Sequence, residues 1–144
     1  MEKQHIIALV CGCGAACEIA ENEFCENQLK MKKIRNELFR MLDASGIQYS
    51  LNGSSDYCID STVNVSFPGV SLEALMISTK QYCGISNGSA CTSKSYSPSY
   101  VLTAMGIPEE QIENSVRISW GSGTDYQEFV ENFSQFLTIA KSLA

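Results

Sequence analysis

The sequence contains little histidine or proline. Its single histidine, His5, leaves few ready-made general bases and few imidazole ligands for a metal ion. Three prolines, 44% apolar residues and 18% charged residues describe a folded globular chain, and this balance excludes a disordered or collagen-like protein. The 144 residues show no internal repeat, low-complexity tract or linker, so we expect one domain over residues 1–144.

Positive charge and long apolar runs are also scarce. The chain has ten lysines and arginines and sixteen acids, which gives a net charge of −6. Nucleic acid is therefore excluded as the main partner, because phosphate binding needs a basic surface. The apolar run at residues 6–10 is too short to cross a bilayer, and the N-terminus lacks the pattern of a secretory signal. We expect a cytoplasmic protein without a membrane partner.

Cysteine, by contrast, is abundant. The chain has seven cysteines, and this odd number leaves at least one thiol unpaired in any intramolecular scheme. Without a secretory signal, the count favours free thiols in a reducing cytoplasm. The seven are Cys11, Cys13, Cys17, Cys25, Cys58, Cys83 and Cys91.

Several segments have the pattern of helices. Residues 6–44 are mostly helix formers, and Gly46 is a typical helix-terminating glycine. Near the C-terminus, Thr124 and Gln127 match a capping box that precedes an apolar helix face. Shorter helices are expected to begin at a serine and two prolines, namely Ser71, Pro98 and Pro108.

Other segments have the pattern of strands. Apolar and polar residues alternate at residues 47–51, 63–67 and 116–120, and a further strand is expected at residues 82–85. Helices interleaved with these strands predict an α/β fold, a compact sandwich of a small three- to four-stranded sheet with helices.

Cys91 is the first candidate for chemistry. It lies in residues 86–95, a stretch rich in serine and glycine that predicts a mobile loop, where a thiol has no packing role. Such a thiol can reach a substrate or a partner, and Lys94 could favour its thiolate. A phosphatase loop is excluded because no arginine follows at the required spacing, and a cysteine protease would have to recruit His5. An incidental surface thiol is the alternative.

Arg117 is the second candidate. If Val116 and Ile118 face the core, Arg117 projects from the opposite face of the same strand. A guanidinium fixed on a strand can clamp a carboxylate through two parallel hydrogen bonds. A surface arginine paired with a neighbouring acid is the alternative.

Two further motifs have ordinary structural explanations. Cys11, Cys13 and Cys17 do not have a common zinc-pair spacing, and no second pair of ligands completes a four-ligand site, so we expect no metal. Residues 121–124 (GSGT) could hold an anion at a helix N-terminus, although such a sequence is more often a capped turn.

Six short motifs follow one another along the chain. They are GAACEIA at 14–20, NVSF at 64–67, GSACTS at 88–93, PSYVL at 98–102, AMG at 104–106 and SVRISWG at 115–121. In this order and spacing they resemble the C-terminal part of the cysteine desulfurases, in the branch that serves iron–sulfur cluster and nitrogenase maturation. The resemblance covers nearly the whole chain, and the motifs around Cys91 and Arg117 are its most specific parts.

The resemblance implies a fold and a chemistry. Cysteine desulfurases are homodimeric, pyridoxal-phosphate-dependent enzymes of the class V aminotransferase family, so the chain is similar to the small domain of fold-type I enzymes. These sulfurtransferases convert cysteine to alanine and hold the released sulfur as a persulfide on a loop cysteine. The resemblance implies that Cys91 is this nucleophile, that Arg117 binds the substrate carboxylate, and that a sulfur-acceptor protein is a partner.

The cofactor-binding half of the family has no counterpart here. A pyridoxal enzyme needs a Schiff-base lysine, an acid on the pyridine nitrogen and a phosphate cup, which the family carries in a preceding large domain. None of the seven lysines stands in the family's histidine–lysine context. We therefore expect no covalently bound pyridoxal phosphate and no complete reaction from this chain alone.

The missing half has consequences for partners. We expect pairing with a large domain or a full-length desulfurase, and self-association through the surface that such a domain would cover. Two alternatives stay open. One is a non-catalytic sulfur carrier or partner-binding module that accepts persulfide from another protein. The other is a degenerate paralogue in which Cys91 is idle.

Overall fold

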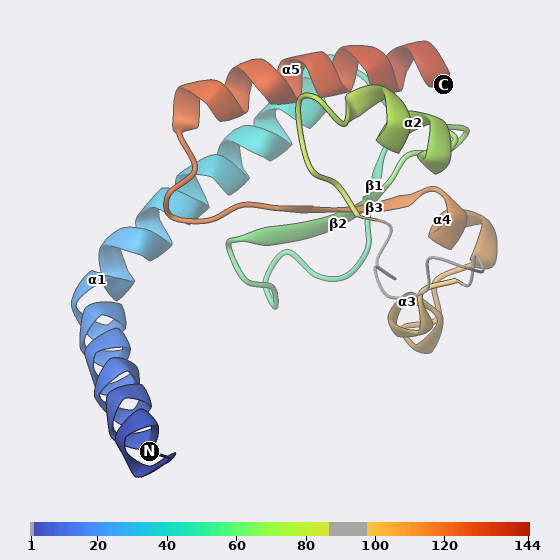
Figure 1. Cartoon of the computed structure of the whole chain (residues 1–144). Coiled ribbons are helices and arrows are strands. Elements are labelled where there is room, and N and C mark those ends of the chain that lie inside the picture. Colours follow the sequence, from blue (N-terminus) through green and yellow to red (C-terminus); the bar gives the residue numbers. More distant parts are fainter. Residues whose placement is uncertain (1, 87–97) are drawn as a thin grey trace.

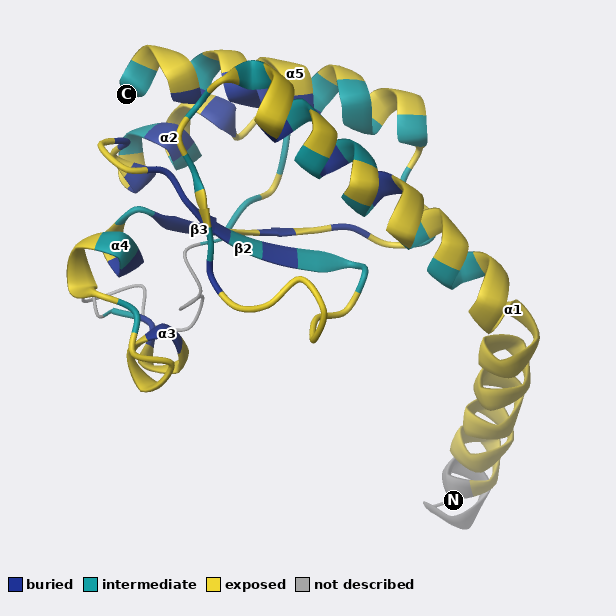
Figure 2. Cartoon of the chain, turned by 180° about the vertical axis from the view of Figure 1, so that it is seen from behind, coloured by how far each residue is buried: buried dark blue, intermediate teal, exposed yellow. Residues whose placement is uncertain are grey.

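A long N-terminal helix is the largest element. The computed structural model describes residues 2–86 and 98–144, with residues 2–6 described by their backbone alone. Helix α1 spans Glu2–Ser45 and projects well beyond the rest of the chain (Figure 1). Its C-terminal half packs through Ile34, Leu38 and Leu42, whereas residues 7–26 are all exposed (Figure 2). Gly46 ends the helix with a φ of 71°, as the sequence predicts.

In the part of the chain that the structure describes, three antiparallel strands form the sheet, in the order β1-β2-β3. Strand β1 spans Ser50–Leu51, β2 spans Thr62–Ser66 and β3 spans Ser115–Ser119. The α/β sandwich predicted from the sequence is confirmed, with a sheet at the lower end of the expected strand number.

The expected strand at residues 82–85 is wrong. The N–H groups of Tyr82 and Cys83 both donate to the carbonyl of Thr79, so the backbone continues the turn that ends a helix rather than joining the sheet. Only the next residue, Ser86, pairs with β3, through an isolated bridge to Arg117.

Three helices cover one face of the sheet. Helices α1, α2 (Leu72–Thr79) and α5 (Tyr126–Leu143) lie together on the same side (Figure 1). They enclose the inward side chains of β2 and β3 in a single apolar cluster. Its fully buried members include Leu38, Leu42, Val65, Phe67, Val70, Leu75, Val116, Phe136 and Ala140.

Two short helices, α3 (Tyr100–Ala104) and α4 (Glu109–Glu113), precede β3. Their caps correct two expectations. The hydroxyl of Ser99, rather than Pro98, marks the start of α3. Asp125, rather than Thr124, caps α5, because its carboxylate accepts the N–H of Glu128 at 2.8 Å. The expected cap at Ser71 is confirmed.

Candidate functional site

The face of the sheet opposite α1, α2 and α5 is polar. Side chains alternate between the two faces of a strand, so every second residue of β1, β2 and β3 falls on this side. Arg117 is the only charged residue among them. The set is Ser50, Thr62, Asn64, Ser66, Ser115, Arg117 and Ser119, together with Asn52, which directly follows β1 and donates its N–H to the carbonyl of Asn64.

The backbone of Arg117 is hydrogen-bonded to Ser86 on one side and lies next to β2 on the other. Its N–H donates to the carbonyl of Ser86 at 2.7 Å, and the N–H of Ser86 donates to the carbonyl of Arg117 at 3.1 Å. Arg117 is also the register partner of Asn64 on β2. Because both backbone groups of Arg117 point toward Ser86, Arg117 and Asn64 form a non-hydrogen-bonded pair, in which side chains come closest.

The Arg117 side chain is exposed, as the alternation of β3 predicts. Among the residues that the structure describes, no carboxylate forms an ion pair with it. The described residues therefore do not form the alternative arrangement, in which a surface arginine pairs with a neighbouring acid. With respect to the described ranges, the guanidinium therefore keeps its donors available for an anion.

A hydrogen-bond network lies beside Arg117. The amide of Asn52, a buried residue, donates to Asn64 Oδ1 and to Ser115 Oγ, both at 2.7 Å. Gln111 Nε2 donates to Asn52 Oδ1 at 2.6 Å, and Ser115 Oγ donates to the carbonyl of Gln111 at 2.6 Å. The network fixes the Asn64 side chain next to Arg117. Sequence patterns do not point to these residues, because Asn52 followed by Gly53 is typical of a turn.

Cys91 and Lys94 lie outside the described residues. Cys91 follows Ser86 by five positions. Covalent geometry therefore keeps its Cα within about 18 Å of the Cα of Ser86 in any conformation. The thiol is thus tethered to the residue that pairs with Arg117.

Most of the other cysteines are exposed. Cys11, Cys13, Cys17 and Cys25 are free, exposed thiols on the projecting half of α1, and nothing in the described chain packs against this half of the helix. Cys83 is half-buried, and this burial raises the pKa of its thiol. Within the described ranges, no three potential metal ligands come together.

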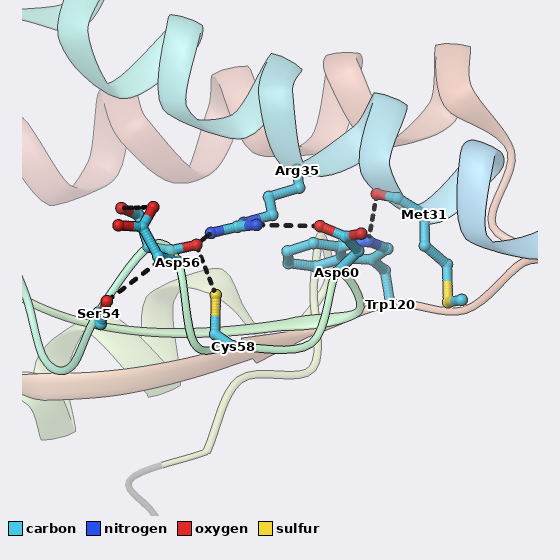
Figure 3. Close-up of polar contacts among 8 residues, drawn as sticks. Met31, Arg35, Ser54, Asp56, Cys58, Asp60 and Trp120 are labelled. Atoms are coloured by element: carbon cyan, nitrogen blue, oxygen red, sulfur yellow. Dashed lines mark hydrogen bonds and ion pairs between the residues drawn. The ribbon is translucent and has the colours of Figure 1, made fainter.

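The loop between β1 and β2 is clamped to α1 (Figure 3). Arg35 donates to Asp60 Oδ1 at 2.9 Å and to the carbonyl of Ser55 at 2.7 Å. The same carbonyl accepts the Cys58 thiol at 3.4 Å. Nearby, Trp120 Nε1 donates to the carbonyl of Met31 at 3.0 Å, which ties the end of β3 to the helix. These contacts lie on the helix side of the sheet and support the core rather than the polar face.

The turn at residues 121–124 is a capped turn. The N–H of Gly121 donates to Thr124 Oγ1 at 3.1 Å, so this donor already has a partner inside the protein. Thr124 thus closes the turn, which explains why it does not cap α5.

The described lysines do not fit a Schiff-base site beside Arg117. Lys30, Lys32 and Lys33 belong to α1, Lys80 ends α2 and Lys141 lies in the last turn of α5. These helices cover the apolar face of the sheet, whereas Arg117 is on the other face. Lys30 pairs with Glu26, and Lys33 lies over the ring of Tyr126. The described residues therefore provide no lysine that could hold pyridoxal phosphate near Arg117.

None of the helices in the described ranges combines the length and the apolar character that a membrane-spanning segment needs.

Comparison with known proteins places the chain among desulfurase homologues. No protein-family model matches the sequence. Cysteine desulfurase IscS of Colwellia psychrerythraea is 37% identical over 119 residues, and the IscS of an Anaeromyxobacter species is 40% identical over 119 residues. Both matches cover 83% of this chain but 29% of the relative, so the chain spans less than a third of the length of these proteins.

Solved structures agree in fold. A NifS-like protein superposes with a TM-score of 0.71 over 92% of this chain and 33% of its own, at 24% identity. DndA from Streptomyces lividans superposes with a TM-score of 0.54 over 74% of this chain, at 30% identity. The chain is therefore a homologue of cysteine desulfurase IscS and shares the fold of NifS-like proteins, and it matches only a part of them, consistent with their C-terminal domain.

Proposed function

We propose that this chain is the C-terminal domain of a cysteine desulfurase, in which Arg117 binds the substrate carboxylate and Cys91 accepts the sulfur. The observation that carries the proposal is the arrangement around Arg117. Arg117 is exposed on a polar sheet face and has no acid partner in the described chain, and its backbone pairs directly with that of Ser86. Five residues after Ser86 comes the thiol.

The two residues have separate tasks. The guanidinium of Arg117 holds the carboxylate of cysteine through two parallel hydrogen bonds and so orients the substrate thiol. The thiolate of Cys91 attacks the substrate sulfur, the carbon–sulfur bond breaks, and a persulfide forms on Cys91. The hydrogens of the two thiols end on the methyl group of alanine and on the persulfide. The balance needs no external oxidant.

Pyridoxal phosphate, when bound in the complete enzyme, supplies the electron sink that makes the carbon–sulfur bond labile. No described lysine of this chain is suited to hold it near Arg117, so we assign its binding to the part of the desulfurase that this chain does not match. By the same reasoning, the sulfur acceptor, a role in iron–sulfur assembly and a location in the cytoplasm are carried over from the family as proposals.

A grafted enzyme tests the proposal. The matched 119 residues of the Colwellia IscS would be replaced by those of this chain, and alanine and sulfide formation from cysteine would be measured. We expect activity that is lost in Cys91→Ala and strongly reduced in Arg117→Gln. An active graft that is indifferent to Cys91→Ala would contradict the assignment of the nucleophile.

A non-catalytic sulfur carrier is the second candidate. It is favoured by the position of the lysines whose side chains the structure describes, which lie in α1 and α5 and at the end of α2, over the opposite face of the sheet from Arg117. A carrier accepts one sulfur from the persulfide of a complete desulfurase, without a cofactor of its own. Sulfur labelling of the intact chain, but not of Cys91→Ala, would support it. Equal labelling of both would show only that other thiols are reactive.

A further inference from the structure

A pocket lies on the helix side of the sheet, at the outer edge of β3. It is enclosed by the segment after α2, the end of β3 and the first half of α5, and its volume is about 340 Å³. Its floor is aromatic. Trp120 and Phe129 have ring centroids 6.3 Å apart, and Phe129 stacks on Phe133 at 5.4 Å. The volume lies near the lower end of the roughly 300–1,000 Å³ typical of ligand sites and suits one or two side chains.

The pocket opens onto an unpaired strand edge. The N–H and C=O groups of Arg117 point away from β2, toward Ser86. Two residues further along the same strand, those of Ser119 point the same way. The N–H of Trp120, one residue later, points back to β2 and donates to the carbonyl of Ser61. Ser119 lines the pocket, and within the described chain its two backbone groups have no partner.

The rim of the pocket is acidic. Asp125 and Glu128 line it, and Glu131 lines an adjoining hollow that shares Tyr82 and Asn132 with it. In the part of the chain that the structure describes, no lysine or arginine forms an ion pair with any of these three acids. A ligand that reaches the aromatic floor therefore passes three acids, of which Asp125 also caps α5.

We propose that this pocket docks an extended segment of a protein partner, which places an apolar side chain on the aromatic floor and a lysine or arginine on each side of it. The open edge at Ser119 offers one donor and one acceptor to an added strand. In such a strand, every second side chain faces the pocket. A basic–apolar–basic pattern at alternate positions therefore places the basic side chains on the acidic rim and the apolar side chain on the aromatic floor. The acidic rim disfavours an acidic segment. The pocket contains neither Arg117 nor Cys91, so this docking does not depend on the proposed desulfurase function.

A short peptide and the single tryptophan provide the test. The probe is acetyl-Lys-Val-Phe-Val-Lys-amide, whose lysines and phenylalanine share one face when extended. Trp120 is the only tryptophan of the chain and lies in the pocket floor, so its fluorescence reports occupancy. We expect a saturable change in Trp120 emission on titration of the intact chain. No saturable change at millimolar peptide would overturn the proposal.

Two altered peptides separate the contributions. Replacing both lysines by glutamate keeps the shape and the apolar anchor but reverses the charge, and we expect binding to be lost. Methylation of the backbone amides keeps the side chains and charge but prevents pairing with Ser119, and we again expect loss. Equal binding of either altered peptide would contradict the proposed docking mode.

Matched variants locate the site. Glu128 and Glu73 are both acids in the first turn of a helix, but only Glu128 lines the pocket. We expect Glu128→Gln to weaken binding of the basic peptide about two- to fivefold, and Glu73→Gln to leave it unchanged. Gly84 lines the pocket, and a Cβ there would meet no atom within 4 Å. Gly84→Leu should therefore fill the pocket and abolish binding without unfolding the chain, as thermal unfolding would verify. Unchanged binding in Gly84→Leu would overturn the proposal.

Discussion

At the scale of single residues, the chemistry of Arg117 depends on its shape as well as its charge. Its backbone is paired with Ser86, and its register partner Asn64 is held by the hydrogen bond from Asn52. The strand therefore presents the guanidinium from a fixed point. A lysine at this position would keep the charge but lose the planar pair of donors that matches a carboxylate.

This difference leads to a prediction for the grafted enzyme. We expect Arg117→Gln to lower kcat/KM for cysteine about 10- to 100-fold, because hydrogen bonds between charged groups contribute about 1.5–3 kcal/mol. Arg117→Lys should recover only part of the loss. Arg40→Gln serves as the control, because Arg40 is an exposed residue of α1 that pairs with Glu37. An Arg117→Gln graft as efficient as the parent would exclude Arg117 from substrate binding.

A second residue-scale prediction concerns alkaline pH. Burial, together with the hydrogen bond to Asp43, raises the pKa of Tyr49 to about 12. In the unfolded chain, tyrosine loses its proton near pH 10. Between about pH 10 and about pH 12 the unfolded state therefore binds fewer protons than the folded state, and the free energy of unfolding falls as the pH rises. Tyr49→Phe should make this fall shallower in urea unfolding measured from about pH 9 to about pH 11.

The matched control is Tyr57→Phe. Tyr57 is 92% exposed, so we expect its replacement to leave the pH dependence as it is in the parent chain. The comparison uses the change of the free energy of unfolding with pH rather than its value at one pH, because Tyr49→Phe also removes the hydrogen bond to Asp43. Equal slopes in the parent and in Tyr49→Phe would show that Tyr49 is not the group responsible.

At the scale of elements, periodicity identified what is regular and missed what depends on tertiary contacts. The long helix and the outward face of Arg117 follow from spacing alone. Residues 82–85 have strand-forming composition, but the N–H groups of Tyr82 and Cys83 donate to the carbonyl of Thr79 and extend the turn at the end of α2, a local turn that alternation of apolar and polar residues does not reveal. The network of Asn52 joins residues up to 63 positions apart, which is also beyond the reach of local periodicity.

The start of α5 illustrates the same limit and gives a third prediction. Thr124 and Asp125 are adjacent, and both are good capping residues. Because the hydroxyl of Thr124 already accepts the N–H of Gly121, Asp125 caps the helix instead. We expect Asp125→Ala to lower the free energy of unfolding by about 0.5–2 kcal/mol, because the N–H of Glu128 loses its partner. Asp125→Asn should restore most of the loss in urea unfolding. An Asp125→Ala variant as stable as the parent would contradict the observed cap.

At the scale of the whole molecule, the exposed half of α1 is the most unusual feature. Residues 7–26 are exposed, yet five of them are large and apolar, from 56% to 73% exposed. They are Ile7, Leu9, Val10, Ile19 and Phe24. Apolar surface of this extent is typical of an interface. We propose that the rest of a desulfurase covers it in the complete enzyme, and that copies of the isolated chain associate through it.

Self-association gives the fourth prediction. In sedimentation equilibrium, the average mass should rise above 15.8 kDa as the concentration increases. Ile7 on the projecting half of α1 and Ile77 on α2 are both 63% exposed. We expect Ile7→Glu to reduce the association and Ile77→Glu to have no effect, with little change in the stability of either variant. A chain that remains a monomer at every concentration would contradict the proposed interface.

The most direct test of the proposed function is the location of the sulfur in the grafted enzyme. After a single turnover of cysteine without a reductant, intact-mass and peptide mass spectrometry would show which residue carries an added sulfur atom. We expect one added sulfur on Cys91 for each alanine formed, and none on Cys91 in the isolated chain given cysteine and pyridoxal phosphate. Sulfur on another cysteine of the graft, or on Cys91 of the isolated chain without the rest of the enzyme, would contradict the proposal.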